Sequence, residues 1–183
     1  MNLFFRLVWV FLKASFAKTQ IDVTGSAVLK FRVWLTDQDM FAHLTNSRYM
    51  SFSDLGTINF IIRSGFWNVM RKRGWFPVIC AQSMTISRML KTPQAFEVTT
   101  QIVGWNETYV GISHTFTRHG NVHAQVNVLA RFTSGKRKKI APQDVITAAG
   151  SDTKSPEMPD AFARLILQID TARDETKKTT LTQ

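Results

Sequence analysis

Side chains able to take part in catalysis cluster between residues 37 and 49. Two aspartates, a histidine, an asparagine and a tyrosine fall within these thirteen positions: Asp37, Asp39, His43, Asn46 and Tyr49. A positioned carboxylate can act as a nucleophile or as a general base on water. The cluster therefore predicts a catalytic turn.

The segments on either side of the cluster predict the elements that hold it. From Val28 to Thr36 apolar residues alternate with polar ones such as Lys30 and Arg32, which is typical of a strand with one buried face. Residues 47–63 contain no proline and carry apolar residues every three or four positions, which predicts a long buried helix capped by Thr45 or Asn46. Residues 37–45 have neither period and predict a loop.

The rest of the chain changes to a strand pattern after a second short helix in residues 66–73. Four segments rich in Val, Ile, Thr and Phe predict strands over Val78–Lys91, Phe96–Trp105, Thr108–Arg118 and Val122–Thr133. Short connections with Pro, Asn or Gly separate them, so we expect an antiparallel meander. The fold class is α+β, with a curved antiparallel sheet of five to six strands around one long helix. One helix leaves a sheet edge uncovered, and we expect that edge to pair with a second subunit.

Three regions are expected along the chain. Residues 1–20 are apolar and basic, 21–145 form the main domain, and 146–183 form a C-terminal loop, a short helix and a frayed tail. The chain is expected to enter a loop from Pro142, near the end of the main domain. Arg6 and Lys13 are seven residues apart, hence on one side of a helix that contains no acid. This segment predicts a membrane-surface helix; a cleaved targeting segment and a helix docked on its own domain remain open.

The net charge of +10 suggests an anionic partner. Nucleic acid is disfavoured because no recognition motif or basic recognition helix is visible. An anionic membrane surface and a phosphate-bearing small substrate remain. Cys80 is the only cysteine, so no internal disulfide can form, and no Cys/His set has zinc spacing. We expect no metal site.

The cluster also carries a family resemblance. Its sequence D-Q-D-M-F-A-H-L-T-N-S-R-Y resembles the motif D-x-D-x-x-G-H-x-N-N-x-x-Y of hotdog-fold acyl-CoA thioesterases of the 4-hydroxybenzoyl-CoA thioesterase type. The segment from Phe76 to Trp105 and the apolar, basic N-terminus resemble the branch called thioesterase superfamily member six. The chain departs from the motif at Ala42, where the family has glycine, and at Thr45, where it has asparagine.

The resemblance implies the roles of the site residues. Asp39 corresponds to the catalytic carboxylate, and the backbone amide of Asn46 to the group that polarises the thioester carbonyl. His43 and the Asn46 side chain would orient the substrate or water. In one branch of the family the acid five residues after the motif tyrosine does the chemistry, and here that acid is Asp54.

Purely structural roles are also open for three of these residues. Asp37 and Asp39 could simply form turn hydrogen bonds, and Tyr49 could be a packing residue. The predicted substrate-binding residues, including cations for the phosphates of coenzyme A, are Asp37, Tyr49, Arg88, Lys91, Lys136 and Arg137.

We therefore expect a cytoplasmic, membrane-associated homodimer or dimer of dimers that hydrolyses an acyl-CoA thioester. No cofactor is expected apart from coenzyme A as part of the substrate. The alternative is a hotdog protein that binds acyl chains or lipids at a membrane surface without turnover.

Overall fold

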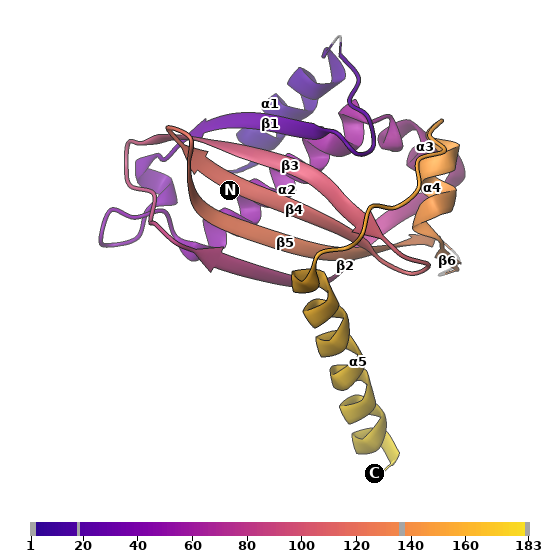
Figure 1. Ribbon diagram of the computed structural model, residues 1–183. Coiled ribbons are helices and arrows are strands. Elements are labelled where there is room, and N and C mark those ends of the chain that lie inside the picture. Colours follow the sequence, from indigo (N-terminus) through magenta and orange to yellow (C-terminus); the bar gives the residue numbers. More distant parts are fainter. Residues whose placement is uncertain (1–2, 18, 136–137, 182–183) are drawn as a thin grey trace.

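A curved antiparallel sheet wraps around one long helix (Figure 1). The computed structural model describes residues 3–17, 19–135 and 138–181. The strands are β1 (Ser26–Arg32), β2 (Trp75–Ile86), β3 (Ala95–Trp105), β4 (Val110–Arg118), β5 (Asn121–Ser134) and β6 (Lys139–Ile140). The long helix is α2 (Asn46–Arg63). The predicted α+β class is confirmed, and the predicted helix agrees with α2 to within one residue.

Aromatic side chains fill the space between α2 and the sheet. The ring of Phe52 on α2 lies 4.7 Å from that of Phe31 on β1 and 5.2 Å from that of Phe96 on β3. Phe52 and Phe96 belong to one buried core cluster, and the partly buried Phe31 packs against it; burial of such rings contributes a large share of core stability. The alternating pattern of β1 therefore has the expected buried face.

The predicted four-strand meander is wrong in one connection. Strands β3, β4 and β5 follow one another as predicted, but the sheet order is β1-β3-β4-β5-β2. β2 pairs with β5 at one edge, and β1 pairs with β3 at the other. Residues 87–94 therefore cross from the β2 edge to the interior of the sheet and do not form a hairpin. Short turn sequences such as T-P-Q do not specify which strands pair.

The loop predicted from Pro142 is also wrong, because a short helix, α4 (Pro142–Ala148), begins there. Proline suits the first turn of a helix, and Val145 and Ile146 on α4 are buried in the core. The expected boundary at residue 145 thus falls inside a packed helix. The C-terminal helix α5 (Asp160–Leu181) anchors Phe162 and Leu165 against the sheet, and its later turns project from the body (Figure 1).

The N-terminal helix α1 (Leu3–Ser15) packs against the sheet-distal side of α2. Val10 and Ala14 on its inner face are buried, and Leu3 and Leu7 contact the core cluster. Three interpretations were left open for this segment: a membrane-surface helix, a cleaved targeting segment and a helix docked on its own domain. The third describes the inner face of α1. Within the described residues, no helix combines the length and apolarity needed to cross a bilayer.

Candidate active site

A tight turn joins β1 to α2 and contains Asp39. After a short 3-10 helix, η1 (Leu35–Asp37), the Asp39 amide donates to the His43 carbonyl at 2.8 Å. The Asp39 carboxylate oxygen Oδ1 accepts from the amides of Phe41 (2.9 Å) and His43 (3.1 Å). Asp39 therefore forms the turn hydrogen bonds that were considered above as its purely structural role. The same bonds fix the direction of its carboxylate.

Ala42 takes the left-handed conformation within this turn, with φ at 60°. Glycine occupies this region without steric strain, whereas a Cβ atom makes it unfavourable by roughly 1–2 kcal/mol. The alanine that departs from the family motif thus keeps a backbone conformation suited to the family's glycine. Alanine in place of glycine at this position therefore adds backbone strain, but the path of the turn stays compatible with the motif.

Ala42→Gly is expected to raise the free energy of unfolding by about 0.5–1 kcal/mol, because strain relief exceeds the extra chain entropy of glycine in the unfolded state. Urea unfolding of both proteins measures the change. Ala163→Gly, at an exposed position of α5, is the matched control and should destabilise its helix. A lower free energy of unfolding in Ala42→Gly than in wild type would contradict the prediction that the backbone of Ala42 is strained.

Asp37 is fully buried and serves the fold. Its carboxylate receives two hydrogen bonds from the Arg6 guanidinium of α1, at 2.9 and 2.7 Å, and one from the Trp34 amide at 3.0 Å. Arg48 Nε lies 3.6 Å from the same carboxylate. Such a compensated acid has no oxygen facing solvent, so the structure places Asp37 away from direct substrate contact. It ties α1 to the turn between β1 and α2.

The start of α2 follows the turn directly. Thr45 precedes the helix, and its amide and hydroxyl both donate to the Asp37 carbonyl at 3.0 Å. Asn46 and Ser47 are exposed, and within the described part of the chain no hydrogen bond is recorded for their amides. Free amides at a helix start, with the positive end of the helix dipole, can stabilise a developing negative charge. Thr45 thus orients the helix start in place of the family's asparagine.

Tyr49 lies in the core, one turn further along α2. Its hydroxyl accepts the Leu90 amide at 3.2 Å, and its ring packs edge-on against Phe116. Burial raises the pKa of the Tyr49 hydroxyl above its usual value. Its surroundings match the packing role weighed for it.

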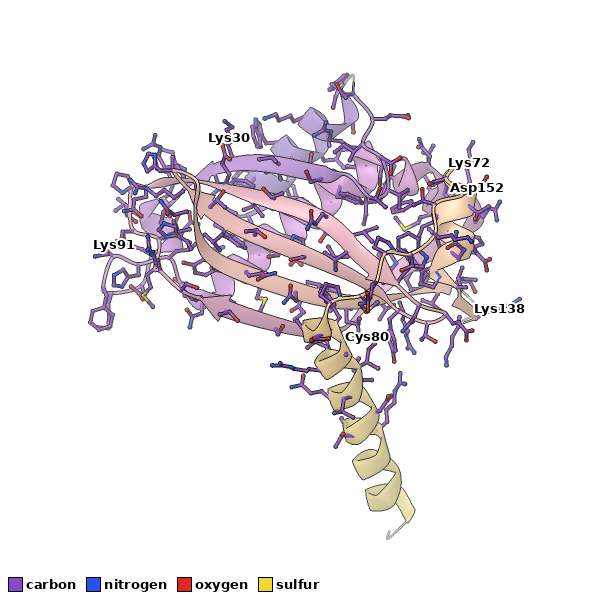
Figure 2. All side chains as sticks on the ribbon, in the orientation of Figure 1. Lys30, Lys72, Cys80, Lys91, Lys138 and Asp152 are labelled. Carbon is purple, nitrogen blue, oxygen red and sulfur yellow. The ribbon has the colours of Figure 1, made fainter. Side chains whose placement is uncertain are left out.

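The predicted basic residues separate into two groups. Lys91 is exposed and pairs through its backbone with His43, which is half-buried, so these two residues are neighbours at the turn. Arg88 is exposed three residues earlier. Lys136 and Arg137 lie outside the described residues. The adjacent Lys138 lies at the opposite end of the molecule from Lys91 (Figure 2).

An apolar cavity of about 300 Å³ lies between α2 and the sheet. Its walls are almost entirely carbon, with Ile102, Ile112 and Val128 on the sheet side. Asp54 of α2 borders the cavity and is also exposed to solvent. Its apolar surroundings desolvate the carboxylate, which raises the pKa of Asp54 above its usual value. The cavity can hold an apolar acyl group beside a carboxylate.

A buried histidine lies behind this cavity. His114 of β4 bonds through Nδ1 to the Thr100 hydroxyl at 2.9 Å, and its Nε2 is 3.4 Å from the hydroxyl of Thr57. Thr57 and Thr100 both line the cavity. A Cβ atom at Gly56 would collide with Thr100 Oγ1, so the glycine allows α2 to approach this group closely. No role was predicted for His114. The alternation of Ile112, His114 and Phe116 already places it on the inward face of β4.

The burial of His114 predicts a pH-dependent stability. Burial lowers its pKa from 6.5 to about 3. Between these values the unfolded state binds a proton that the folded state does not, so stability falls as the pH is lowered through this window, by about 1.4 kcal/mol per pH unit. Urea unfolding of wild type and His114→Gln between about pH 7.5 and 5 isolates this contribution. Equal pH slopes in the two proteins would contradict it.

The comparisons agree with this arrangement. The model of the thioesterase-like superfamily matches residues 33–166, which include the turn, α2 and strands β2 to β6. The chain belongs to this superfamily. The thioesterase-like chain is 28% identical to Protein THEM6 of Danio rerio over 128 residues, which are 70% of the chain and 63% of that protein. It is 25% identical to Protein THEM6 of Xenopus laevis over 116 residues, 60% of the chain and 56% of that protein. The chain therefore spans less than two thirds of the length of these relatives.

Solved structures show the same fold. YbaW, a probable thioesterase from Escherichia coli, superimposes with a TM-score of 0.63 at 16% identity, over 67% of the thioesterase-like chain and 94% of YbaW. A mutant 4-hydroxybenzoyl CoA thioesterase in complex with 4-hydroxybenzoyl CoA gives a TM-score of 0.59 at 18% identity, over 68% and 98% of the two chains. The predicted hotdog fold and the family resemblance are confirmed.

Proposed function

We propose that this chain hydrolyses acyl-CoA thioesters to a free acid and coenzyme A. The observation that carries the proposal is the start of α2, where the amides of Asn46 and Ser47 have no hydrogen-bond partner among the described residues and directly follow a turn that fixes the Asp39 carboxylate. The superfamily and the thioesterases that share the fold support this class of reaction.

In the proposed reaction the amide of Asn46 hydrogen-bonds the thioester carbonyl oxygen and stabilises the negative charge that develops on it. Asp39 acts as the carboxylate. As a nucleophile it would form an anhydride with the acyl group and release the coenzyme A thiolate, and water would then hydrolyse the anhydride. As a general base it would take a proton from water as the water oxygen attacks the carbonyl carbon; the C–S bond would then break, and the coenzyme A thiolate would leave and take up a proton. His43 would orient the substrate or the water.

The acyl group would enter the apolar cavity behind α2, whose walls favour a fatty or aromatic group. Lys91, beside His43, and Arg88 would meet the phosphates of coenzyme A. The same cavity also suits a protein that only binds acyl chains. Binding of acyl-CoA without release of free thiol would favour this second function.

A dimer is part of the proposal. β2 forms an edge of the sheet, and its residues Phe76 and Ile79 are exposed although both are large and apolar. Unpaired strand edges with apolar side chains are favourable sites for pairing with a second copy. Sedimentation velocity should therefore give about twice the chain mass of 20.9 kDa, and a monomer at micromolar concentration would contradict this part.

The function is tested by removing one backbone amide. Asn46 is the first residue of α2, where proline is well tolerated, and the backbone of Thr45 (φ −60°, ψ 141°) is compatible with a following proline. Asn46→Pro removes the proposed oxyanion donor and is expected to lower kcat for acyl-CoA hydrolysis by about 10²- to 10³-fold. Asn46→Ala keeps the amide and is the matched control.

The assay follows free coenzyme A thiol over acetyl, medium-chain, long-chain and benzoyl substrates. Equal activities of the proline and alanine variants would remove the helix start from the mechanism. Absence of turnover with every substrate in wild type would reject hydrolysis of these acyl-CoA thioesters.

A further inference from the structure

The face of α1 that points away from α2 exposes large apolar side chains. They are Phe4, Phe5, Val8, Trp9 and Leu12 on the helix and Phe16 directly after its last residue. Folded proteins rarely leave a contiguous apolar patch of this size uncovered, and such patches commonly contact another protein or a membrane.

Trp34, the residue before η1, and Leu35, the first residue of η1, extend this apolar patch. A hollow of about 430 Å³ lies between α1 and the β1–η1 segment, and Phe5, Trp34 and Leu35 line it. These three side chains are 78%, 58% and 72% exposed, respectively. We call the surface formed by these six residues, Phe4 to Phe16 as named above, together with Trp34 and Leu35, the α1 face.

Cations surround the α1 face. The Lys13 amino group lies 4.7 Å from the centre of the Trp9 ring. Lys30 and Arg32 of β1 line a second hollow of about 280 Å³ with Trp9. Lys30 also pairs with Glu97 at 3.1 Å. Figure 2 shows Lys30 and Lys72 on the half of the molecule that carries α1.

The net positive charge of the chain is concentrated in its first half. Residues 1–96 contain twelve Lys or Arg and four Asp or Glu, whereas residues 97–183 contain eleven and nine. Residues 1–96 thus carry +8 of the net charge of +10, and residues 1–74, which form α1, β1, α2 and α3 (Phe66–Arg73), carry +6 of it. Two copies meeting through their α1 faces would bring like charges together, which opposes self-association there.

The α1 face is fixed relative to the candidate active site. Arg6 on the inner side of α1 holds the buried Asp37 through two hydrogen bonds, and Asp37 lies two residues before Asp39. A surface that engages the α1 face therefore also sets the orientation of the turn.

We propose that the α1 face docks on an anionic lipid bilayer. The helix lies in the plane of the interface, Trp9 and Trp34 reach the headgroup level, and Lys13, Lys30 and Arg32 lie near lipid phosphates. Aromatic side chains with nearby cations are favourable at this depth, and basic residues near an anionic leaflet strengthen binding. The proposal does not depend on the hydrolytic activity.

Vesicle co-sedimentation of the full chain tests the proposal. One set of vesicles is phosphatidylcholine alone, and the other contains about 30% phosphatidylserine. Wild type is expected to bind the anionic vesicles more strongly, and raising the salt to about 0.5 M should weaken that binding. The variant Phe5→Ser, Trp34→Ser, Leu35→Ser should lower partitioning about tenfold or more, since all three side chains are exposed.

The matched control replaces three exposed apolar residues elsewhere by serine: Met89, Val122 and Leu167. It should bind within about twofold of wild type. Thermal unfolding verifies that both triple variants fold. An equal loss in the control, or no binding of wild type to either vesicle, would overturn the proposal. Dissociation of an oligomer by the α1-face variant, seen by light scattering, would instead make this face a subunit interface and would also overturn it.

Discussion

Replacing Arg6 by alanine is expected to lower the free energy of unfolding by about 3 kcal/mol, toward the lower end of the range for breaking a buried ion pair. Asp37 is fully buried, and Arg6 donates two of the hydrogen bonds that compensate its charge. Arg48, whose Nε is 3.6 Å away, retains part of the compensation, which is why the lower end is expected. Urea unfolding at neutral pH measures the change.

Two variants control this prediction. Lys13→Ala removes an exposed cation from the same helix and should change stability by less than about 0.5 kcal/mol. Asp37→Asn in the Arg6→Ala background removes the uncompensated charge and should recover part of the loss. A loss below about 1 kcal/mol for Arg6→Ala would mean that the ion pair is not integral to the fold.

The ion pair also explains why deletion of residues 1–17 is a poor test of membrane association. Such a deletion removes Arg6 together with the exposed aromatic residues of α1, so loss of folding and loss of lipid contact would occur together. The substitutions on the α1 face avoid this, because Phe5, Trp34 and Leu35 are exposed.

Local patterns were sufficient for the elements around the site. The alternation in β1, the apolar stripe of α2 and the irregular residues between them predicted the strand, the helix and the turn, because each period is a property of neighbouring residues. The predicted helix over residues 47–63, with Thr45 or Asn46 left open as its cap, begins one residue after the start of α2. The positive φ of Ala42 is consistent with the glycine of the family pattern.

Long-range contacts were not predictable in the same way. Asp37 pairs with Arg6, 31 residues away, and nothing in the local sequence indicates that partner. β2 lies at the sheet edge because it pairs with β5, a choice that depends on side-chain packing across the whole sheet. Lys91 lies beside the turn, whereas Lys138 lies at the far end, although both flank predicted strands. Proximity in a folded sheet depends on strand order, which the turn sequences did not specify.

The two carboxylates near α2 have environments that suggest different roles. Asp39 is held by two amides through one oxygen, so its carboxylate is oriented before substrate binds. Asp54 borders the apolar cavity, and desolvation raises the pKa of its carboxyl above the usual value. We therefore propose that Asp39 performs the attack or the proton abstraction and that Asp54 contacts the substrate.

Asp39→Asn is expected to lower kcat for acyl-CoA hydrolysis by about 10²- to 10⁴-fold. The asparagine oxygen can still accept the amides of Phe41 and His43, so the turn is retained while the charge and its reactivity are lost. Asp54→Asn should change kcat by about tenfold or less and should keep or increase stability, because the desolvated charge is removed. Thiol release assays and urea unfolding of both variants give these values. A larger loss of kcat in Asp54→Asn than in Asp39→Asn would transfer the chemistry from the turn to the helix, with the amide of Asn46 retained as the oxyanion donor.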